Sequence, residues 1–174
     1  EELSKGMQQK VQFVITVLHE PSLLIFDEPF SGFDPVNAEL LKREILALKD
    51  KGHTVIFSTH NMASVEDICD EMALIHRSKV ALSGNVAEVK KRFRTGKYEL
   101  VCVGDEQLVD TENYKVLSHV ATDGVQRYLL HKAEGLTNSE LVALLAQKAE
   151  IHHFSEQLPS MHEIFLKTVQ SHEE

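Results

Sequence analysis

The sequence lacks several features that mark whole classes of protein. It has only two cysteines, Cys69 and Cys102, in 174 residues, which is too few for a disulfide framework or a cysteine-rich zinc site. No apolar stretch approaches the roughly twenty residues of a membrane-spanning helix, and no secretory signal opens the sequence. The 18 basic residues against 27 acidic ones give a net charge of −9, which argues against binding to nucleic acid. We therefore expect a protein of the reducing cytosol that reaches a membrane only through a partner.

Two adjacent acidic residues, Asp27 and Glu28, follow the short apolar run 23–26. A run this short that ends in Asp-Glu-Pro indicates a buried parallel strand. Such a strand would deliver both carboxylates to the carboxyl edge of a sheet, where open α/β folds bind their ligands. One carboxylate can hold Mg²⁺, and the other can take a proton from an attacking water. An aspartate at a strand end can also simply cap the next helix.

A helix is expected over 5–19, where apolar residues recur at helical spacing and Ser4 is placed to cap the first turn. A helix N-terminus with a serine hydroxyl and a glycine backbone N–H, here Ser4 and Gly6, is also a natural phosphate site. On local grounds a plain N-cap accounts for Ser4 equally well.

A second helix is expected over 35–51, with Asp34 as its cap and Pro35 at its first position. The apolar strand expected over 54–57 follows it. A strand–helix–strand unit places its two strands in parallel, with their carboxyl ends at one edge of the sheet. Glu28 and His60 should therefore lie close together.

Four short motifs, in this order, resemble those of the ATPase subunits of ATP-binding cassette (ABC) transporters. Residues 3–7 match the signature motif, 23–28 the Walker B motif, 31–34 the D-loop, and His60 the switch histidine. The resemblance implies an α/β fold, the C-terminal part of a P-loop NTPase cassette with a parallel sheet and flanking helices. It also implies ATP and Mg²⁺ as ligands, and a second ATPase subunit and a transmembrane permease as partners.

The resemblance gives a role to each residue at the strand ends. Asp27 would bind Mg²⁺, and Glu28 would polarise the water that attacks ATP. His60 would contact the γ-phosphate and position Glu28. The implied reaction is phosphoryl transfer to water, in which positioning and charge stabilisation do most of the catalysis.

The same resemblance places three further residues at the interface of two subunits. Ser4 and Gly6 would close over the nucleotide held by the opposite subunit, and Asp34 would link the two sites. Lys5 and Met7 depart from the commonest signature, Leu-Ser-Gly-Gly-Gln, whereas the serine and the second glycine remain.

A cassette needs a phosphate loop, G-x-x-x-x-G-K-[ST], whose backbone N–H groups and lysine cradle the phosphates. This sequence has none, because its only Gly-Lys pair, Gly96-Lys97, is followed by Tyr98. We therefore expect the sequence to be the C-terminal part of a cassette, cut just before the signature motif, and to be inactive alone.

The character of the sequence changes at 94–97, which we interpret as the boundary between a cassette part, 1–95, and an accessory domain, 96–174. The remaining elements expected before the boundary are a helix at 61–72, strands at 73–76 and 79–82, and a helix at 86–93. Those expected after it are strands at 98–103, 114–120, 125–131 and 151–154, and helices at 138–149 and 161–170. This small α+β unit resembles the accessory C-terminal domain of ATPases that serve drug- and polysaccharide-exporter-type systems.

The function most consistent with these features is that of the ATPase subunit of an exporter, held at the inner face of the cell membrane through its permease. Two other interpretations stay open. One is a non-transport ABC ATPase, although the tandem cassettes, basic linkers and coiled-coil insertions usual in such proteins are not visible. The other is a regulatory module without activity, because the phosphate loop is absent.

Overall fold

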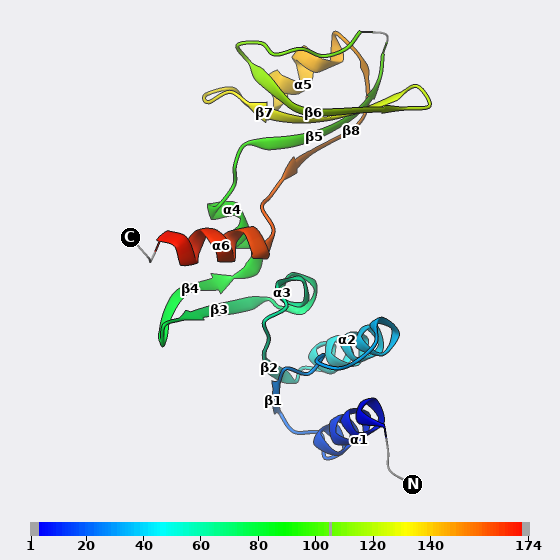
Figure 1. The fold of residues 1–174 in the computed structure, drawn as a ribbon, viewed down its shortest axis with the longest axis vertical. Coiled ribbons are helices and arrows are strands. Elements are labelled where there is room, and N and C mark those ends of the chain that lie inside the picture. The colour runs from blue at the N-terminus through cyan, green and yellow to red at the C-terminus, as the bar shows by residue number, and fades with distance from the viewer. Residues whose placement is uncertain (1–3, 105, 172–174) are drawn as a thin grey trace. The chain divides into compact units, whose positions relative to one another are not determined.

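The computed structural model describes residues 4–104 and 106–171, without the side chain of Lys5. The chain divides into two compact units, Glu1–Met72 and Ala73–Glu174. The elements of each unit are labelled along the ribbon in Figure 1. The fold is α/β, with a parallel strand pair in the first unit and an antiparallel sheet in the second.

The first unit is built on the parallel strand pair that the sequence predicts. β1 (Leu23–Asp27) pairs with β2 (Thr54–Ser58) along its whole length, and α2 (Pro35–Asp50) connects them. The remaining helices are α1 (Lys5–Val17) before the pair and α3 (Met62–Ile68) after it. The predicted strand–helix–strand unit is confirmed.

The helices pack on one face of this strand pair. Leu41 and Ile45 of α2 and Ile68 of α3 form its buried core. The ring of Phe13 on α1 stacks on that of Phe26 on β1, with 5.5 Å between ring centroids. Burial of these apolar side chains, at about 25 cal/mol per Å² of area removed from water, is the main force that holds the unit together.

The other face of the strand pair is apolar and open in the part of the chain that the structure describes. Ile25 is 68% exposed and Ile56 is 54% exposed, whereas Leu24, which points to the helices, is 1% exposed. Parallel sheets are normally covered on both faces. The described residues therefore cover one of the two faces that a parallel strand pair ordinarily buries.

The helix caps follow the sequence closely. The Ser4 hydroxyl accepts a hydrogen bond from the backbone N–H of Met7 at 3.3 Å. Asp34 caps α2 with Pro35 at the first helical position, and Asn61 caps α3. Each cap satisfies backbone donors that the first turn of a helix leaves unpaired.

The second unit begins with a pair of strands and a short helix. β3 (Glu71–His76), whose first two residues belong to the first unit, pairs with β4 (Lys79–Asn85), and α4 (Val86–Arg92) follows directly. β4 runs three residues beyond the strand expected over 79–82, and Asn85 then caps α4.

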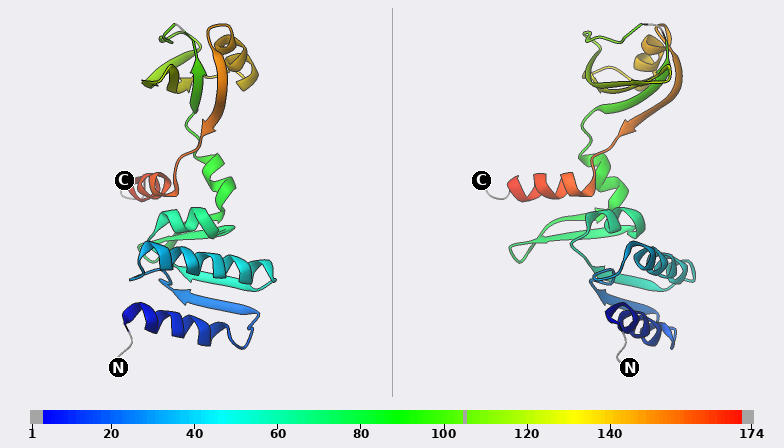
Figure 2. Two further views of the ribbon diagram at one scale, coloured as in Figure 1. Left: turned by 90° about the vertical axis from the view of Figure 1, so that its right-hand side faces the viewer. Right: turned by 45° about the vertical axis from the view of Figure 1, so that its right-hand side comes forward.

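A four-stranded antiparallel sheet forms the rest of the second unit. Its strands are β5 (Lys97–Val103), β6 (Tyr114–Thr122), β7 (Val125–Lys132) and β8 (Glu150–Gln157), in the spatial order β6-β7-β5-β8. α5 (Asn138–Ala146) packs on one face of this sheet (Figure 2). The buried core between them consists of Leu100, Cys102, Leu108, Tyr114, Tyr128, Leu130, Leu141 and Leu145.

Two connections in the second unit are tight two-residue turns. Arg77 and Ser78, between β3 and β4, have φ angles of 48° and 61°, and Asp123 and Gly124, between β6 and β7, have φ angles of 50° and 78°. Positive φ at both central residues is the mark of a type I′ turn, whose twist suits a hairpin. Asp-Gly is a preferred pair for this turn, so the residue types by themselves predict the type I′ turn at Asp123 and Gly124.

The last helix, α6 (Met161–Ser171), contacts β4. Met161 and Ile164 are each 1% exposed, and the ammonium group of Lys167 lies 5.8 Å from the ring centroid of Phe93 at the end of α4. The boundary predicted between 95 and 96 thus falls within the second compact unit. That division of the chain stays a prediction.

Two predicted helices end earlier in the structure than expected. The helix predicted over 61–72 stops at Ile68, because Cys69 is extended (φ −89°, ψ 137°) and Glu71 already belongs to β3. The helix predicted over 138–149 stops at Ala146, and β8 begins at Glu150. At the first place strand pairing takes Glu71 and Met72, whose local pattern is also compatible with a helix. At the second, residues 147–149 form the turn between α5 and β8.

Acid should destabilise the second unit through two helix caps. Hydrogen bonds from Thr137 hold the pKa of Glu140 below its usual value, and hydrogen bonds from Ser160 do the same to the pKa of Glu163. A depressed folded-state pKa gives stability that is present above about pH 4.3, the ordinary glutamate pKa, and is lost as the pH falls through the folded value. The double variant Glu140→Gln, Glu163→Gln should therefore lose less stability than the parent between pH 7 and pH 3.

The readout is urea unfolding followed by tyrosine fluorescence, since the chain has no tryptophan and its three tyrosines all lie in the second unit. Glu112→Gln with Glu134→Gln is the matched control, because both glutamates are exposed and lie in the second unit. Equal acid sensitivity of the cap variant and the parent would contradict the prediction.

Candidate active site at the strand ends

The carboxyl ends of β1 and β2 meet at one edge, as predicted. Asp27 lies opposite Ser58 in the parallel register, and the Ser58 hydroxyl donates a hydrogen bond to Asp27 Oδ1. The backbone N–H of Glu28 donates to the carbonyl oxygen of Ser58 at 3.1 Å. This hydrogen bond extends the pairing of the two strands one residue past β1 and fixes the position of the Glu28 backbone.

Glu28 has an unusual backbone conformation. Its φ angle is 44°, a left-handed value that costs a non-glycine residue about 1–2 kcal/mol. The turn is held by its contact with Ser58 and by a 3.0 Å hydrogen bond from the backbone N–H of Ser31 to the Glu28 carbonyl. Strain kept at a strand end by surrounding contacts is typical of functional sites.

The Glu28 carboxylate reaches across to the residues that follow β2. Its Oε1 accepts a hydrogen bond from the His60 backbone N–H at 2.9 Å and lies 2.6 Å from His60 Nδ1. Because a carboxylate only accepts, Nδ1 must carry the proton of that bond. The predicted proximity of Glu28 and His60 is confirmed.

The exposure of these side chains suits a site that receives a ligand. The His60 side chain is 85% exposed and the Glu28 side chain 35% exposed. His60 Nε2, at the far end of the ring from Glu28, is therefore accessible to a ligand, and the carboxylate is partly shielded. This combination places a potential base beside a potential phosphate contact.

Two hydroxyl groups at this edge had no role in the sequence interpretation. Ser58 Oγ bonds Asp27, and Thr59 Oγ1 lies 3.4 Å from Glu28 Oε2. The sequence Ser-Thr-His at the end of an apolar strand indicates that two hydroxyl groups lie near this edge. It does not indicate which residues they contact, because those contacts depend on the turn at Glu28.

The helix N-terminus at Ser4 is described in part. Leu3, the first residue matched to the signature motif, lies outside the described residues. A side chain at Gly6 would meet only a ring atom of Phe33 at 4.0 Å, an ordinary contact. Nothing described in the chain thus demands glycine at this position, and among the described residues Ser4 and Gly6 form no hydrogen bond with Asp27, Glu28 or His60.

Asp34 acts as the cap that the sequence predicts. Its Oδ1 accepts hydrogen bonds from the backbone N–H groups of Val36 and Asn37, each at 3.0 Å. The bond from the Asn37 backbone is the largest cause of a pKa lowered from its usual value. Asp34 is therefore held as a carboxylate at neutral pH, whereas its position at a subunit interface stays a prediction.

α1 is linked to the segment between β1 and α2 by one side chain. Gln9 Nε2 donates a 2.6 Å hydrogen bond to the Ser31 carbonyl oxygen. This bond joins the helix that Ser4 caps to the segment matched to the D-loop.

The donors at the strand ends fit a magnesium ion. Mg²⁺ prefers hard oxygen ligands and is usually held by one or two carboxylates together with substrate phosphates and water. Asp27 supplies such a carboxylate, with Ser58 fixing one of its oxygens. Within residues 4–104 and 106–171, no cluster of three or more histidine, cysteine or acidic side chains forms a metal site by itself.

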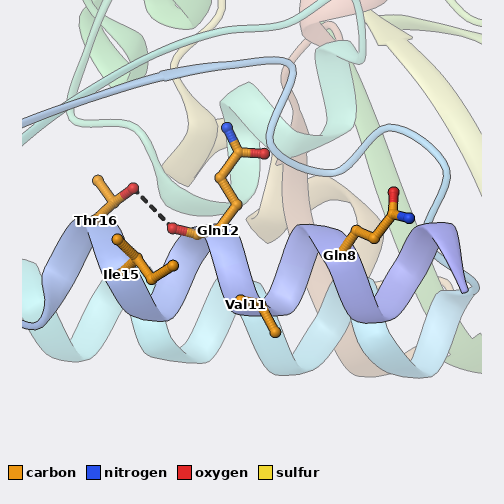
Figure 3. A pocket seen from close by; sticks show the side chains of 5 residues that line it. All are labelled: Gln8, Val11, Gln12, Ile15 and Thr16. Carbon is orange, nitrogen blue, oxygen red and sulfur yellow. Dashed lines mark hydrogen bonds between the residues drawn. The ribbon is translucent and has the colours of Figure 1, made fainter. Parts of the chain in front are cut away.

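A shallow hollow elsewhere on the first unit is lined by α1 alone. Figure 3 shows its lining side chains, which are Gln8, Val11, Gln12, Ile15 and Thr16. Val11 and Ile15 are 45% and 63% exposed. The hollow contains no group of the strand-end site. Among the described residues, no helix is both long and apolar enough to cross a bilayer.

Known families match both parts of the chain. The C-terminal domain of DrrA1-3-like ATP-binding proteins matches residues 84–169. An AAA domain named for the AbiEii toxin of a type IV TA system matches residues 1–66.

Individual relatives extend over nearly the whole chain. The ABC transporter ATP-binding protein YhaQ of Bacillus subtilis is 41% identical over 97% of this chain and 56% of its own length. An ABC transporter ATP-binding protein of Alkalihalophilus pseudofirmus is 38% identical over 97% of this chain and 62% of its own length. The chain thus spans about three fifths of these relatives.

A shorter match and a solved structure carry related names. A fluoroquinolones export ATP-binding protein of Mycobacterium tuberculosis is 39% identical over 50% of this chain and 29% of its own length. A solved ATP-binding subunit of an ABC transporter is 38% identical, covers 53% of this chain and 38% of its own chain, and superposes with a TM-score of 0.49. From the YhaQ and Alkalihalophilus matches and the DrrA-like domain, the chain belongs to the family of ABC transporter ATP-binding proteins.

Proposed function

We propose that this chain supplies the hydrolytic edge and the accessory domain of an ATPase subunit that powers an ABC exporter. The observation that carries the proposal is the Glu28 carboxylate, which His60 holds through two contacts beside Asp27. The whole protein is then the polypeptide that joins this chain to a phosphate loop.

Glu28 is the proposed general base. It takes a proton from the water that attacks the γ-phosphate of ATP. His60 fixes the carboxylate through Nδ1–H, and with its ring doubly protonated it would also donate Nε2–H to the phosphate. Asp27 is the proposed magnesium ligand, and bound Mg²⁺ would neutralise charge on the phosphate oxygens. A positioned base typically contributes about 10²–10⁴-fold to the rate.

Two subunits are proposed to share each nucleotide. Ser4 and Gly6 stand at the N-terminus of α1, where backbone N–H groups attract anions, and would close on the ATP of the opposite subunit. Asp34 would lie at that interface, and the Gln9–Ser31 bond would connect the two segments. A homodimer is the simplest assembly.

Transport is proposed through a separate permease. The relatives are named as ABC transporter ATP-binding proteins, and one shorter match is named for fluoroquinolone export. We propose export as the direction, and a place at the cytoplasmic face of the membrane held through the permease. ATP-driven closure of the two subunits would switch the permease between conformations.

The alternatives are a non-transport ABC ATPase and a regulatory protein without activity. The gene distinguishes them. A reading frame that continues upstream into G-x-x-x-x-G-K-[ST], next to a gene for a protein with several membrane spans, would support the transport ATPase. A reading frame that starts at this chain without a phosphate loop would contradict it.

The 174-residue chain alone is expected not to hydrolyse ATP, because it contains no phosphate loop to hold the β- and γ-phosphates. The measurement is phosphate release by the purified chain with ATP and Mg²⁺, beside the whole protein at equal concentration. Magnesium-dependent turnover by the chain that Glu28→Gln leaves unchanged would contradict both the requirement for the loop and the role of Glu28.

A further inference from the structure

Two hydroxyl groups at the end of β2 each contact one of the two acidic residues at the end of β1. We propose that Ser58 and Thr59 are positioning residues, with Ser58 orienting Asp27 and Thr59 orienting Glu28 for proton transfer. This inference rests on the proposed ATPase function and assigns roles to two residues that contact the acidic pair without reacting themselves.

Ser58 connects both acidic residues to β2. A serine hydroxyl has one proton and two lone pairs. The proton is used in the bond to Asp27 Oδ1, so the 3.2 Å contact with the Glu28 backbone N–H must use a lone pair. Ser58 therefore fixes one oxygen of Asp27 and leaves the other for a metal ion.

Thr59 faces the second oxygen of Glu28. Its Oγ1 accepts a hydrogen bond from the Asn61 backbone N–H at 3.1 Å, and this contact aims the hydroxyl proton elsewhere. Glu28 Oε2, at 3.4 Å, is the acceptor within reach. Since Asn61 also caps α3, the orientation of Thr59 is tied to the start of that helix.

The two oxygens of Glu28 are thus held unequally. Oε1 accepts two close contacts from His60, at 2.9 and 2.6 Å, whereas Oε2 has one long contact, which is weak by the usual geometry of O–H···O bonds. Oε2 keeps a lone pair for the water, and Thr59 restricts rotation of the carboxylate about its bond to the chain. Efficient proton transfer depends on such alignment, and small misplacements have large effects on rate.

The experiment compares Thr59→Val with Thr59→Ser in the whole protein. Valine keeps the shape of threonine and lacks the hydroxyl, whereas serine keeps the hydroxyl. We expect Thr59→Val to lower kcat several-fold, less than the loss of a full hydrogen bond to a charged group because the 3.4 Å contact is long, with the KM for ATP within about twofold of the parent. Thr59→Ser should restore most of kcat. Thr54→Val, at the exposed start of β2, is the matched control and should leave kcat unchanged.

Ser58→Ala provides an independent arm, with an expected several-fold rise in the Mg²⁺ concentration for half-maximal activity. The inference is overturned if Thr59→Val and Ser58→Ala keep the parent kcat and magnesium dependence, or if Thr59→Ser falls as far as Thr59→Val. Glu28→Gln is measured beside them. If Glu28→Gln retains the parent rate, the proposed function is wrong. If Glu28→Gln is inactive while Thr59→Val and Ser58→Ala are fully active, only the roles of Ser58 and Thr59 are wrong.

Discussion

Replacing Glu28 by glutamine in the whole protein should lower the rate of ATP hydrolysis by about 10²–10⁴-fold. Glutamine keeps the size of the side chain and can still accept the hydrogen bond from the His60 backbone at Oε1. It loses the negative charge and the basicity, so the attacking water is no longer deprotonated. Phosphate release with saturating ATP and Mg²⁺ measures the effect.

Binding of ATP should survive the same change, because the phosphates are held by groups other than Glu28. The affinity for a fluorescent ATP analogue should therefore stay near that of the parent. Glu44→Gln is the matched control, since Glu44 lies on the exposed side of α2, and it should hydrolyse ATP normally. A Glu28→Gln protein with the parent rate would show that the general base lies elsewhere.

Truncating Leu141 to alanine should cost the second unit about 2–5 kcal/mol of unfolding free energy. Leu141 on α5 is 0% exposed and packs in the core beneath the four-stranded sheet. The change removes three carbon atoms from a close-packed interior and leaves a cavity that the sheet can only partly fill. In a unit of this size, such a loss is a large share of the total stability.

Urea unfolding of the 174-residue chain, followed by tyrosine fluorescence, reports on this unit alone. Leu166→Ala is the matched control, because Leu166 on α6 is 45% exposed, and it should change the free energy by about 0.5 kcal/mol or less. Equal midpoints for Leu141→Ala and Leu166→Ala would show that α5 does not pack on the sheet.

Much of the first unit could be predicted from local patterns. The short apolar run at 23–26, directly before Asp27 and Glu28, predicts the strand, and Asp34 followed by Pro35 marks a helix start by simple chemistry. The burial predicted for that strand holds for one face only in the described part of the chain, where Leu24 is 1% and Ile25 68% exposed. The parallel pairing then follows from the connection rules, and with it the meeting of Glu28 and His60.

The details of the site could not be predicted, because they depend on one turn. Glu28 has a left-handed backbone, and from this turn its carboxylate reaches both His60 and Thr59. No pattern of residue types specifies a positive φ at a glutamate. The roles of Ser58 and Thr59 therefore emerge only when the two strand ends are seen together.

The predicted end of the helix over 61–72 was wrong because strand pairing decides it. Asp70 and Glu71 fit the polar side of a helix that starts at Asn61, yet Glu71 joins β3. Strand pairing overrides local propensity there.

The most direct test of the ATPase assignment is the molar mass of the whole Glu28→Gln protein in solution, measured by light scattering with and without ATP and Mg²⁺. Two subunits that share nucleotides but cannot hydrolyse them should accumulate as a closed dimer. We predict a dimer with ATP and Mg²⁺ that dissociates when the nucleotide is removed. A protein that stays monomeric at saturating ATP, or that consumes the ATP at the parent rate, would contradict the assignment of this strand-end site as a shared ATPase centre.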